Sequence, residues 1–177
     1  MIANIALAVA GLIAALLVYV ALQPPAFRVA RSALIEAPRA AVFQQVDDFH
    51  NWDHWSPWAK KDPNAKAEFF GAPSGEGAGF AWEGNREVGR GRMTIVESRP
   101  HDLIRIRLEF SAPMQATNEA LFTFEPEGEA TRVTWAMTGT NNVFGRLLCT
   151  FMSMDRMVGS EFQKGLASMK AIVERKA

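Results

Sequence analysis

The feature of this sequence that most constrains its fold is a series of short alternating segments followed by one long amphipathic helix. From residue 67 onward, apolar and polar side chains alternate, with glycine or asparagine between the runs. A period of two places successive side chains on opposite faces of a sheet, so the pattern predicts an antiparallel meander. The six predicted strands are residues 67–71, 79–83, 88–97, 103–110, 115–125 and 131–138.

A further strand and short helical segments precede this meander. Residues 27–36 alternate well enough for an opening strand, and Pro38 suits the first position of a helix that continues through Phe49. Residues 52–58 hold three tryptophans and predict an irregular or one-turn segment. The domain therefore opens with a strand and a short amphipathic helix.

After the meander, apolar residues recur every three or four positions from Phe151 to Val173, which predicts a helix about 30 Å long. The sheet must cover its apolar face, and this helix is the natural cover. In the strand 103–110, Ile104 and Ile106 point toward the helix, whereas Arg105 points to solvent. The order of elements predicts an α+β domain.

The amino-terminal segment carries no charged side chain before Arg28. As a helix, residues 2–22 would reach about 31 Å, which matches the hydrocarbon thickness of a bilayer. We predict a transmembrane anchor over 1–22, a linker over 23–26 and a domain over 27–177. A cleaved signal peptide would need a basic start and a shorter apolar run. A buried core helix is the third alternative.

The side of the membrane follows from the arginines near the predicted span. Arg28, Arg31 and Arg39 follow it, and only the terminal amine precedes it. Positive charge favours the cytoplasmic side, so we expect a single-pass protein of the bacterial inner membrane with its domain in the cytoplasm.

Composition excludes several classes of function. The chain has 19 Lys and Arg against 19 Asp and Glu, and no basic run, which argues against nucleic acid as a partner. The single cysteine, Cys149, permits no internal disulfide and no thiolate zinc site by itself, and we interpret it as a small buried residue. We expect no cofactor, and the sequence leaves the oligomeric state open.

Some residue groups have a chemical and a plain structural interpretation. Five metal-capable side chains lie between Asp47 and His54, but their spacing differs from known zinc motifs, so we expect no metal there. The glycines of 75–79 and 89–91 fit hairpins or bulges better than a phosphate loop, because no helix follows them. No motif of an activated nucleophile is present.

Five short motifs together resemble one family. The motifs are VDDF at 46–49, WDHWSPW at 52–58, FAWEGN at 80–85, VGRG at 88–91 and GSEFQKGL at 159–166. The chain is similar to the SRPBCC (START-like) superfamily, in its polyketide cyclase/dehydrase-like branch, over about residues 27–175. The resemblance implies a helix-grip fold, in which a curved antiparallel sheet of about seven strands wraps the C-terminal helix around an elongated apolar cavity. Members carry lipids, quinones or hormones, or act as cyclases and dehydratases.

Three functions are compatible with this fold. We expect a membrane-tethered binding protein for a small hydrophobic or amphipathic ligand, such as a lipid, a quinone or a polyketide-like molecule. One alternative is a polyketide cyclase/dehydratase-type enzyme acting on an aromatic or polyketide-like substrate. Another is an interaction module with no cavity. The inward positions are almost wholly apolar, which favours binding, because acid–base catalysis needs a titratable group at the substrate. No catalytic residue is assigned.

The predicted ligand site lies between the sheet and the last helix. Asn118 is the polar group on the apolar face, placed either to orient a ligand carbonyl or to bond a neighbouring side chain or water. The tryptophans of 52–58 either line a cavity mouth or close the edge of the core. The predicted lining is Trp55, Trp58, Trp82, Ile106, Asn118, Phe122, Trp135, Phe162 and Leu166.

Overall fold

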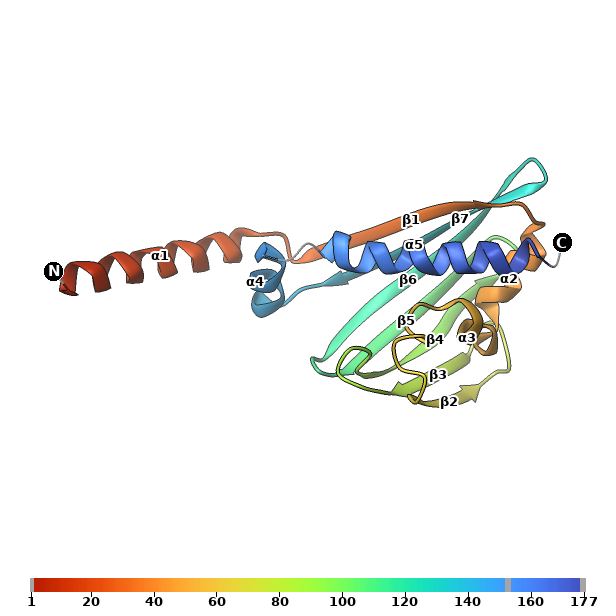
Figure 1. Cartoon of the computed structure of the whole chain (residues 1–177), viewed down its shortest axis with the longest axis horizontal. Helices are drawn as coiled ribbons and strands as arrows, with labels where there is room; N and C mark the ends of the chain where they lie inside the picture. The colour runs from red at the N-terminus through yellow and green to blue at the C-terminus, as the bar shows by residue number, and fades with distance from the viewer. Residues whose placement is uncertain (1, 152–153, 176–177) are drawn as a thin grey trace.

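Seven strands form one antiparallel sheet in the order β1-β7-β6-β5-β4-β3-β2, which confirms the predicted sheet. The computed structural model describes residues 2–151 and 154–175, without some side chains of the first helix and of the helix before the last. The sheet curves around the last helix, α5 (Figure 1). The strands are β1 (Ala26–Ile35), β2 (Lys66–Gly71), β3 (Ala78–Glu83), β4 (Arg90–Arg99), β5 (Leu103–Ala112), β6 (Ala116–Glu127) and β7 (Ala130–Thr140).

The helices differ from the prediction at one place. A separate helix, α4, precedes the last helix, which begins at Met154 rather than Phe151. The signal for α4 is a capping asparagine: Asn142 Oδ1 accepts a hydrogen bond of 2.8 Å from Gly145 N. The expected burial of Cys149 lies outside the described side chains. The helices are α1 (Ile2–Leu22), α2 (Arg39–Asp47), the 3₁₀ turn η1 (Phe49–Asn51), α3 (Trp52–Trp55), α4 (Val143–Phe151) and α5 (Met154–Val173).

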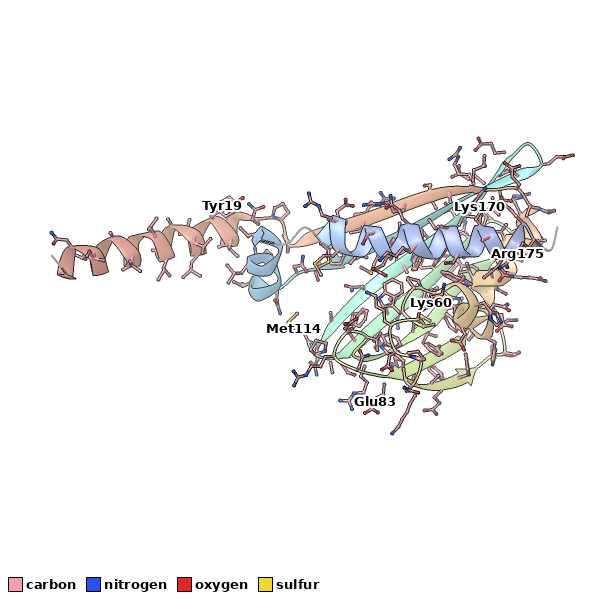
Figure 2. The ribbon with its side chains drawn as sticks, in the orientation of Figure 1. Tyr19, Lys60, Glu83, Met114, Lys170 and Arg175 are labelled. Carbon is pink, nitrogen blue, oxygen red and sulfur yellow. The ribbon has the colours of Figure 1, made fainter. Side chains whose placement is uncertain are left out.

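The amino-terminal segment forms the helix α1, which extends away from the domain (Figure 1). In the part of the chain that the structure describes, no helix combines the length and apolarity needed to cross a membrane, so the predicted transmembrane span is not supported. The described large apolar side chains of α1 are mostly exposed, and Tyr19 projects from its last turns (Figure 2). Arg146 of α4 joins the two helices, because its Nη1 donates to the carbonyls of Ala21 and Gln23 at 3.1 and 3.0 Å.

Helix α5 lies on the face of the sheet that the alternation predicts, which we call the inner face. Arg31 of β1 reaches over this helix at Gly159 and donates to both carboxylate oxygens of Asp155, at 2.8 and 2.9 Å. At the other end of α5, Lys170 Nζ donates to the Leu34 carbonyl at 2.7 Å. The edge strand β1 is therefore fastened to α5 at both ends.

We predict that the Arg31–Asp155 pair makes stability depend on acidity. Hydrogen bonds from Arg31 hold the pKa of Asp155 below its ordinary value. The stabilisation is complete above the ordinary aspartate pKa of about 3.9 and is lost as the pH falls through the lowered folded value. Urea unfolding of Asp155→Asn should show a deficit at pH 6 that shrinks toward zero below pH 3.

The matched control for this series is Glu76→Gln, which removes an exposed carboxylate from the loop between β2 and β3. Its unfolding free energy should follow the wild-type curve across the same pH range. A deficit of Asp155→Asn that stays constant down to pH 2.5 would contradict the assignment.

Candidate functional site

An aromatic cluster fills the space between the sheet and the middle of α5. Its centre is Trp135 of β7, which stacks on Phe162 of α5 with ring centroids 4.0 Å apart and planes 10° apart. Phe122 of β6 stacks on the same indole at 4.9 Å. Trp55 and Trp58 meet it edge-on, each at 5.6 Å. The structure thus brings together five of the nine predicted lining residues.

Local structure fixes the tryptophans of 52–58. The single turn of α3 directs Trp52 and Trp55 inward, and their indoles donate to the carbonyls of Val46 and Gln45 at 3.1 and 2.8 Å. Trp55 is fully buried, whereas Trp58 is half-buried. These rings therefore pack as a core cluster that closes one end of the sheet, and we call this end of the inner face the closed half.

Toward the other end of the sheet, the inner face is no longer fully covered by helices. On β5, Ile104 and Ile106 are completely buried, whereas Leu108 and Phe110 are only half-buried although they point the same way. On β6 the change falls between Ala120, which is buried, and the half-buried Asn118 and Ala116. We call this part the open half. Apolar side chains that point inward and still reach solvent are suited to hold an apolar ligand. The open half comprises Trp82, Leu108, Phe110, Ala116 and Asn118.

Two predicted site residues, Trp82 and Asn118, lie in the open half, and each packs closely over a glycine of the neighbouring strand. Trp82 lies over Gly91, where a Cβ would come within 2.7 Å of the indole. The Trp82 indole donates to the Val88 carbonyl at 3.0 Å. Asn118 Oδ1 occupies the space above Gly139 that a side chain there would fill. Both predicted residues lie on the inner face, two rows or more along the strands from Trp135.

Two loops border the open half beside β3. Asp62 Oδ2, in the segment between α3 and β2, accepts a hydrogen bond of 2.6 Å from Asn85 N in the turn between β3 and β4. In the same segment Lys61 Nζ lies 3.5 Å from Glu161 of α5. The segment thus straps the edge of the sheet to the helix. On the other side lies Met114, in the turn after β5 (Figure 2).

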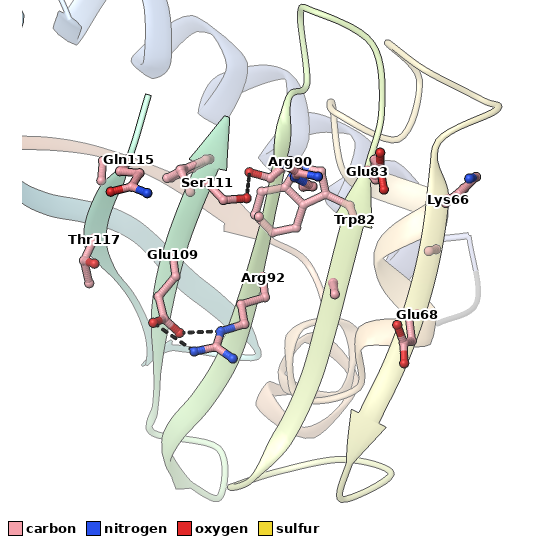
Figure 3. A pocket seen from close by; sticks show the side chains of 15 residues that line it. Lys66, Glu68, Trp82, Glu83, Arg90, Arg92, Glu109, Ser111, Gln115 and Thr117 are labelled. Carbon is pink, nitrogen blue, oxygen red and sulfur yellow. Dashed lines mark hydrogen bonds and ion pairs between the residues drawn. The ribbon is translucent and has the colours of Figure 1, made fainter. Parts of the chain in front are cut away.

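A groove of about 1070 Å³ crosses strands β2 to β6 at the same end of the sheet (Figure 3). By strand alternation its charged side chains lie on the face away from α5. Arg92 donates to both carboxylate oxygens of Glu109 at 2.8 and 3.1 Å, and these bonds lower the pKa of Glu109. The alternation marks this face as solvent-exposed, so sequence reasoning missed the charged lining. Trp82, a predicted site residue, also lines the groove, together with Phe110 and Ala116 of the open half. The charged lining is Lys66, Glu68, Glu83, Arg90, Arg92 and Glu109.

The metal-capable residues near α2 have structural roles. Asp48 Oδ1 accepts from the backbone nitrogen of His50 and lies 2.7 Å from its Nδ1, while Asp47 Oδ1 accepts from Ser98 at 2.6 Å. The His50 ring stacks on Phe69 of β2 at 4.0 Å. Over residues 2–151 and 154–175, no three His, Cys, Asp or Glu side chains are grouped to hold a metal ion.

Comparison with known proteins agrees with this architecture. The family described as "Polyketide cyclase / dehydrase and lipid transport" matches residues 26–174. Among solved structures, the di-domain ARO/CYC StfQ from the steffimycin biosynthetic pathway superposes with a TM-score of 0.64 at 13% identity, covering 85% of this chain and 51% of StfQ. Protein CV1439 from Chromobacterium violaceum gives 0.60 at 15% identity, covering 86% of this chain and 99% of CV1439.

A third similar structure is Ara h 8.0201, with a TM-score of 0.58 at 11% identity, covering 85% of this chain and 99% of that protein. No curated protein matches the sequence. At these identities the structural likeness establishes the fold.

The packing of Trp135 on α5 gives a prediction. A Cβ at Gly165 would lie 2.9 Å from Trp135 Cζ3 and 3.1 Å from Pro57 Cδ. Gly165→Ala should therefore lower the unfolding free energy by about 1–3 kcal/mol through overpacking, although alanine favours the helix. Denaturant unfolding measures this change. Gln163→Ala, at an exposed position of α5, should change stability by less than about 0.5 kcal/mol. An equal effect of the two substitutions would contradict the tight fit.

Proposed function

Because the chain belongs to the polyketide cyclase/dehydrase and lipid transport family, we propose that it binds a small hydrophobic or amphipathic molecule on the open half of the inner face. The observation that carries this proposal is the loss of cover along β5, where inward-pointing Leu108 and Phe110 remain half-exposed. Covering such apolar surface is favourable by about 25 cal/mol per Å². An apolar ligand supplies the cover that α5 does not.

The chemistry of the open half favours binding over catalysis. None of its five described side chains, from Trp82 to Asn118, titrates near neutral pH. The carboxylates and guanidinium groups at this end of the sheet, such as Glu109 and Arg92, point to the other face, where the groove brings them near the edge of the open half. A cyclase or dehydratase needs a proton donor or acceptor at its substrate. The enzymatic alternative takes its support from the family description and from the fold shared with StfQ.

The shape of the site narrows the ligand class. One wall is aromatic, because Trp82 and Phe110 meet edge to face with centroids 5.6 Å apart. Asn118 supplies one amide among apolar neighbours, and an isolated amide can orient a carbonyl or hydroxyl of the ligand. Lipids, quinones and polyketide-like molecules share this combination of apolar surface and a few oxygen atoms.

We also propose that α1 associates with membranes, with the domain on the cytoplasmic side. The first charged side chain of the sequence is Arg28, and exposed apolar side chains such as Leu7, Leu12 and Leu22 point in several directions around the helix. A helix that is apolar on all sides is favoured in an apolar surrounding. Arginines that follow such a helix favour the cytoplasmic side.

The ligand site is tested by a pair of neighbouring substitutions on β5. Leu108→Gln adds a polar group to the open half, whereas Arg107→Gln changes the adjacent side chain on the opposite face. With N-phenyl-1-naphthylamine as a neutral fluorescent probe, Leu108→Gln should weaken binding about 10-fold or more, because the amide must be desolvated. Arg107→Gln should bind like the wild type.

Thermal unfolding of both variants separates lost binding from lost folding. Equal binding by the two variants, with both still folded, would contradict the proposed site. Turnover of an aromatic polyketide-like substrate by the wild-type protein would instead favour the enzymatic alternative. Absence of binding by the folded wild type to any apolar probe would favour the interaction module with a filled core.

Membrane association is tested by fractionation. The full chain should sediment with membranes and resist carbonate washing, whereas a chain that begins at Ala26 should remain in the supernatant. A reporter that requires the periplasm, fused after Ala177, should stay inactive. Recovery of the full chain in the soluble fraction would overturn the association, and an active periplasmic reporter would overturn the proposed side.

A further inference from the structure

Trp135 carries a buried hydrogen-bond donor that no group of the described chain accepts. Trp135 is only 3% exposed, and its Nε1 has no hydrogen-bond partner among the described residues. Three other indoles are paired: Trp52, Trp55 and Trp82 each donate to a backbone carbonyl at 2.8–3.1 Å. A buried donor without an acceptor is costly, so such an atom needs an explanation.

The surroundings of Trp135 are aromatic. Phe162 and Phe122 stack on it, and three further indoles stand edge-on to it, the closest at 5.6 Å. These neighbours offer ring faces and edges instead of oxygen acceptors. An acceptor for this donor must therefore come from outside the cluster.

The indole is oriented by its contact with α5. The Cζ3 edge of Trp135 faces Gly165, and in an indole Nε1 lies on the opposite edge from Cζ3. Gly165 follows Phe162 along α5, on the side of the closed half, where α5 contacts α3. The donor is consequently directed away from Gly165.

Between Trp135 and the open half, the inner face is built partly of small residues. The next row along the strands pairs Met137 with Ala120, and the row after that pairs Gly139 with Asn118. Ala120 is small, whereas Met137 is buried on this path and Asn118 fills the space above Gly139. A flat molecule entering from the open half therefore passes Asn118 and then Met137, an unbranched side chain that can change its rotamer, before it meets the indole.

We propose that Trp135 Nε1 is the specificity donor of the ligand site, and that it binds a neutral carbonyl oxygen of a flat apolar ligand. This inference rests on the proposed function and adds the atom that selects the ligand. The ligand's rings lie against the aromatic cluster, and its carbonyl takes the hydrogen bond that the chain does not supply. A purely hydrocarbon ligand of the same shape would leave the donor unpaired.

The test compares two ligands of nearly equal shape. 2-Acetylnaphthalene has a ketone oxygen, and 2-isopropylnaphthalene replaces that oxygen with a methyl group. Calorimetric titration of the full chain should show that Trp135→Phe weakens the ketone about 3- to 10-fold, as expected for loss of one hydrogen bond. The affinity for the hydrocarbon should change less than twofold. Trp52→Phe, at a residue outside the predicted lining, is the control, because the Trp52 donor is already paired with the Val46 carbonyl. It should leave the ratio of the two affinities unchanged.

A second measurement does not depend on a variant. In a ¹H–¹⁵N spectrum of the wild type, the indole Nε1 signal of Trp135 should move downfield with the ketone and remain nearly unchanged with the hydrocarbon. If Trp135→Phe lowers the affinity for both ligands equally, or if the ketone does not shift the indole signal, the donor role is overturned and the proposed function still stands. Failure of the wild type to bind either naphthalene would overturn both.

Discussion

The stacking of Phe162 on Trp135 is the contact on which the rest of the domain depends. It joins the last helix to β7, next to the strand that closes one edge of the sheet. Gly165 lets the helix come close enough for the indole to reach it. With α5 held there, the loop tryptophans close one end, and the curvature of the sheet carries the other end beyond the reach of the helix. The open half follows from where this contact lies along α5.

The two faces of the sheet consequently have different chemistry. The inner face is aromatic and aliphatic, with Asn118 as a rare amide in the open half. The outer face carries ion pairs, such as Arg92 with Glu109 and Arg105 with Glu97 and Glu119. Exposed pairs of this kind contribute little to stability individually. Because these charged side chains alternate with the inward ones, they lie on the opposite face of the same strands from the apolar inner face.

Much of the fold could be predicted from the sequence, because strand alternation is a local property. The inward direction of Ile106, Phe122 and Trp135 follows from counting by twos, and the long helix follows from its apolar stripe. Helix α4 was missed, since its start depends on the cap at Asn142. The difference between the closed and open halves could not be predicted either, because it depends on where a distant helix crosses the sheet. Whether the nine predicted residues line a cavity with a bound ligand stays a prediction.

The link between α1 and α4 gives the amino-terminal helix a mechanical consequence. Two carbonyls at the end of α1 are held by one guanidinium, that of Arg146, and Asn141 N donates to the Pro25 carbonyl at 2.8 Å. The short segment after α1 is thus clamped to the connection between β7 and α5. A tilt of α1 therefore pulls on the end of β7 through Asn141 and on α4 through Arg146, so a force applied to the amino-terminal helix reaches the sheet.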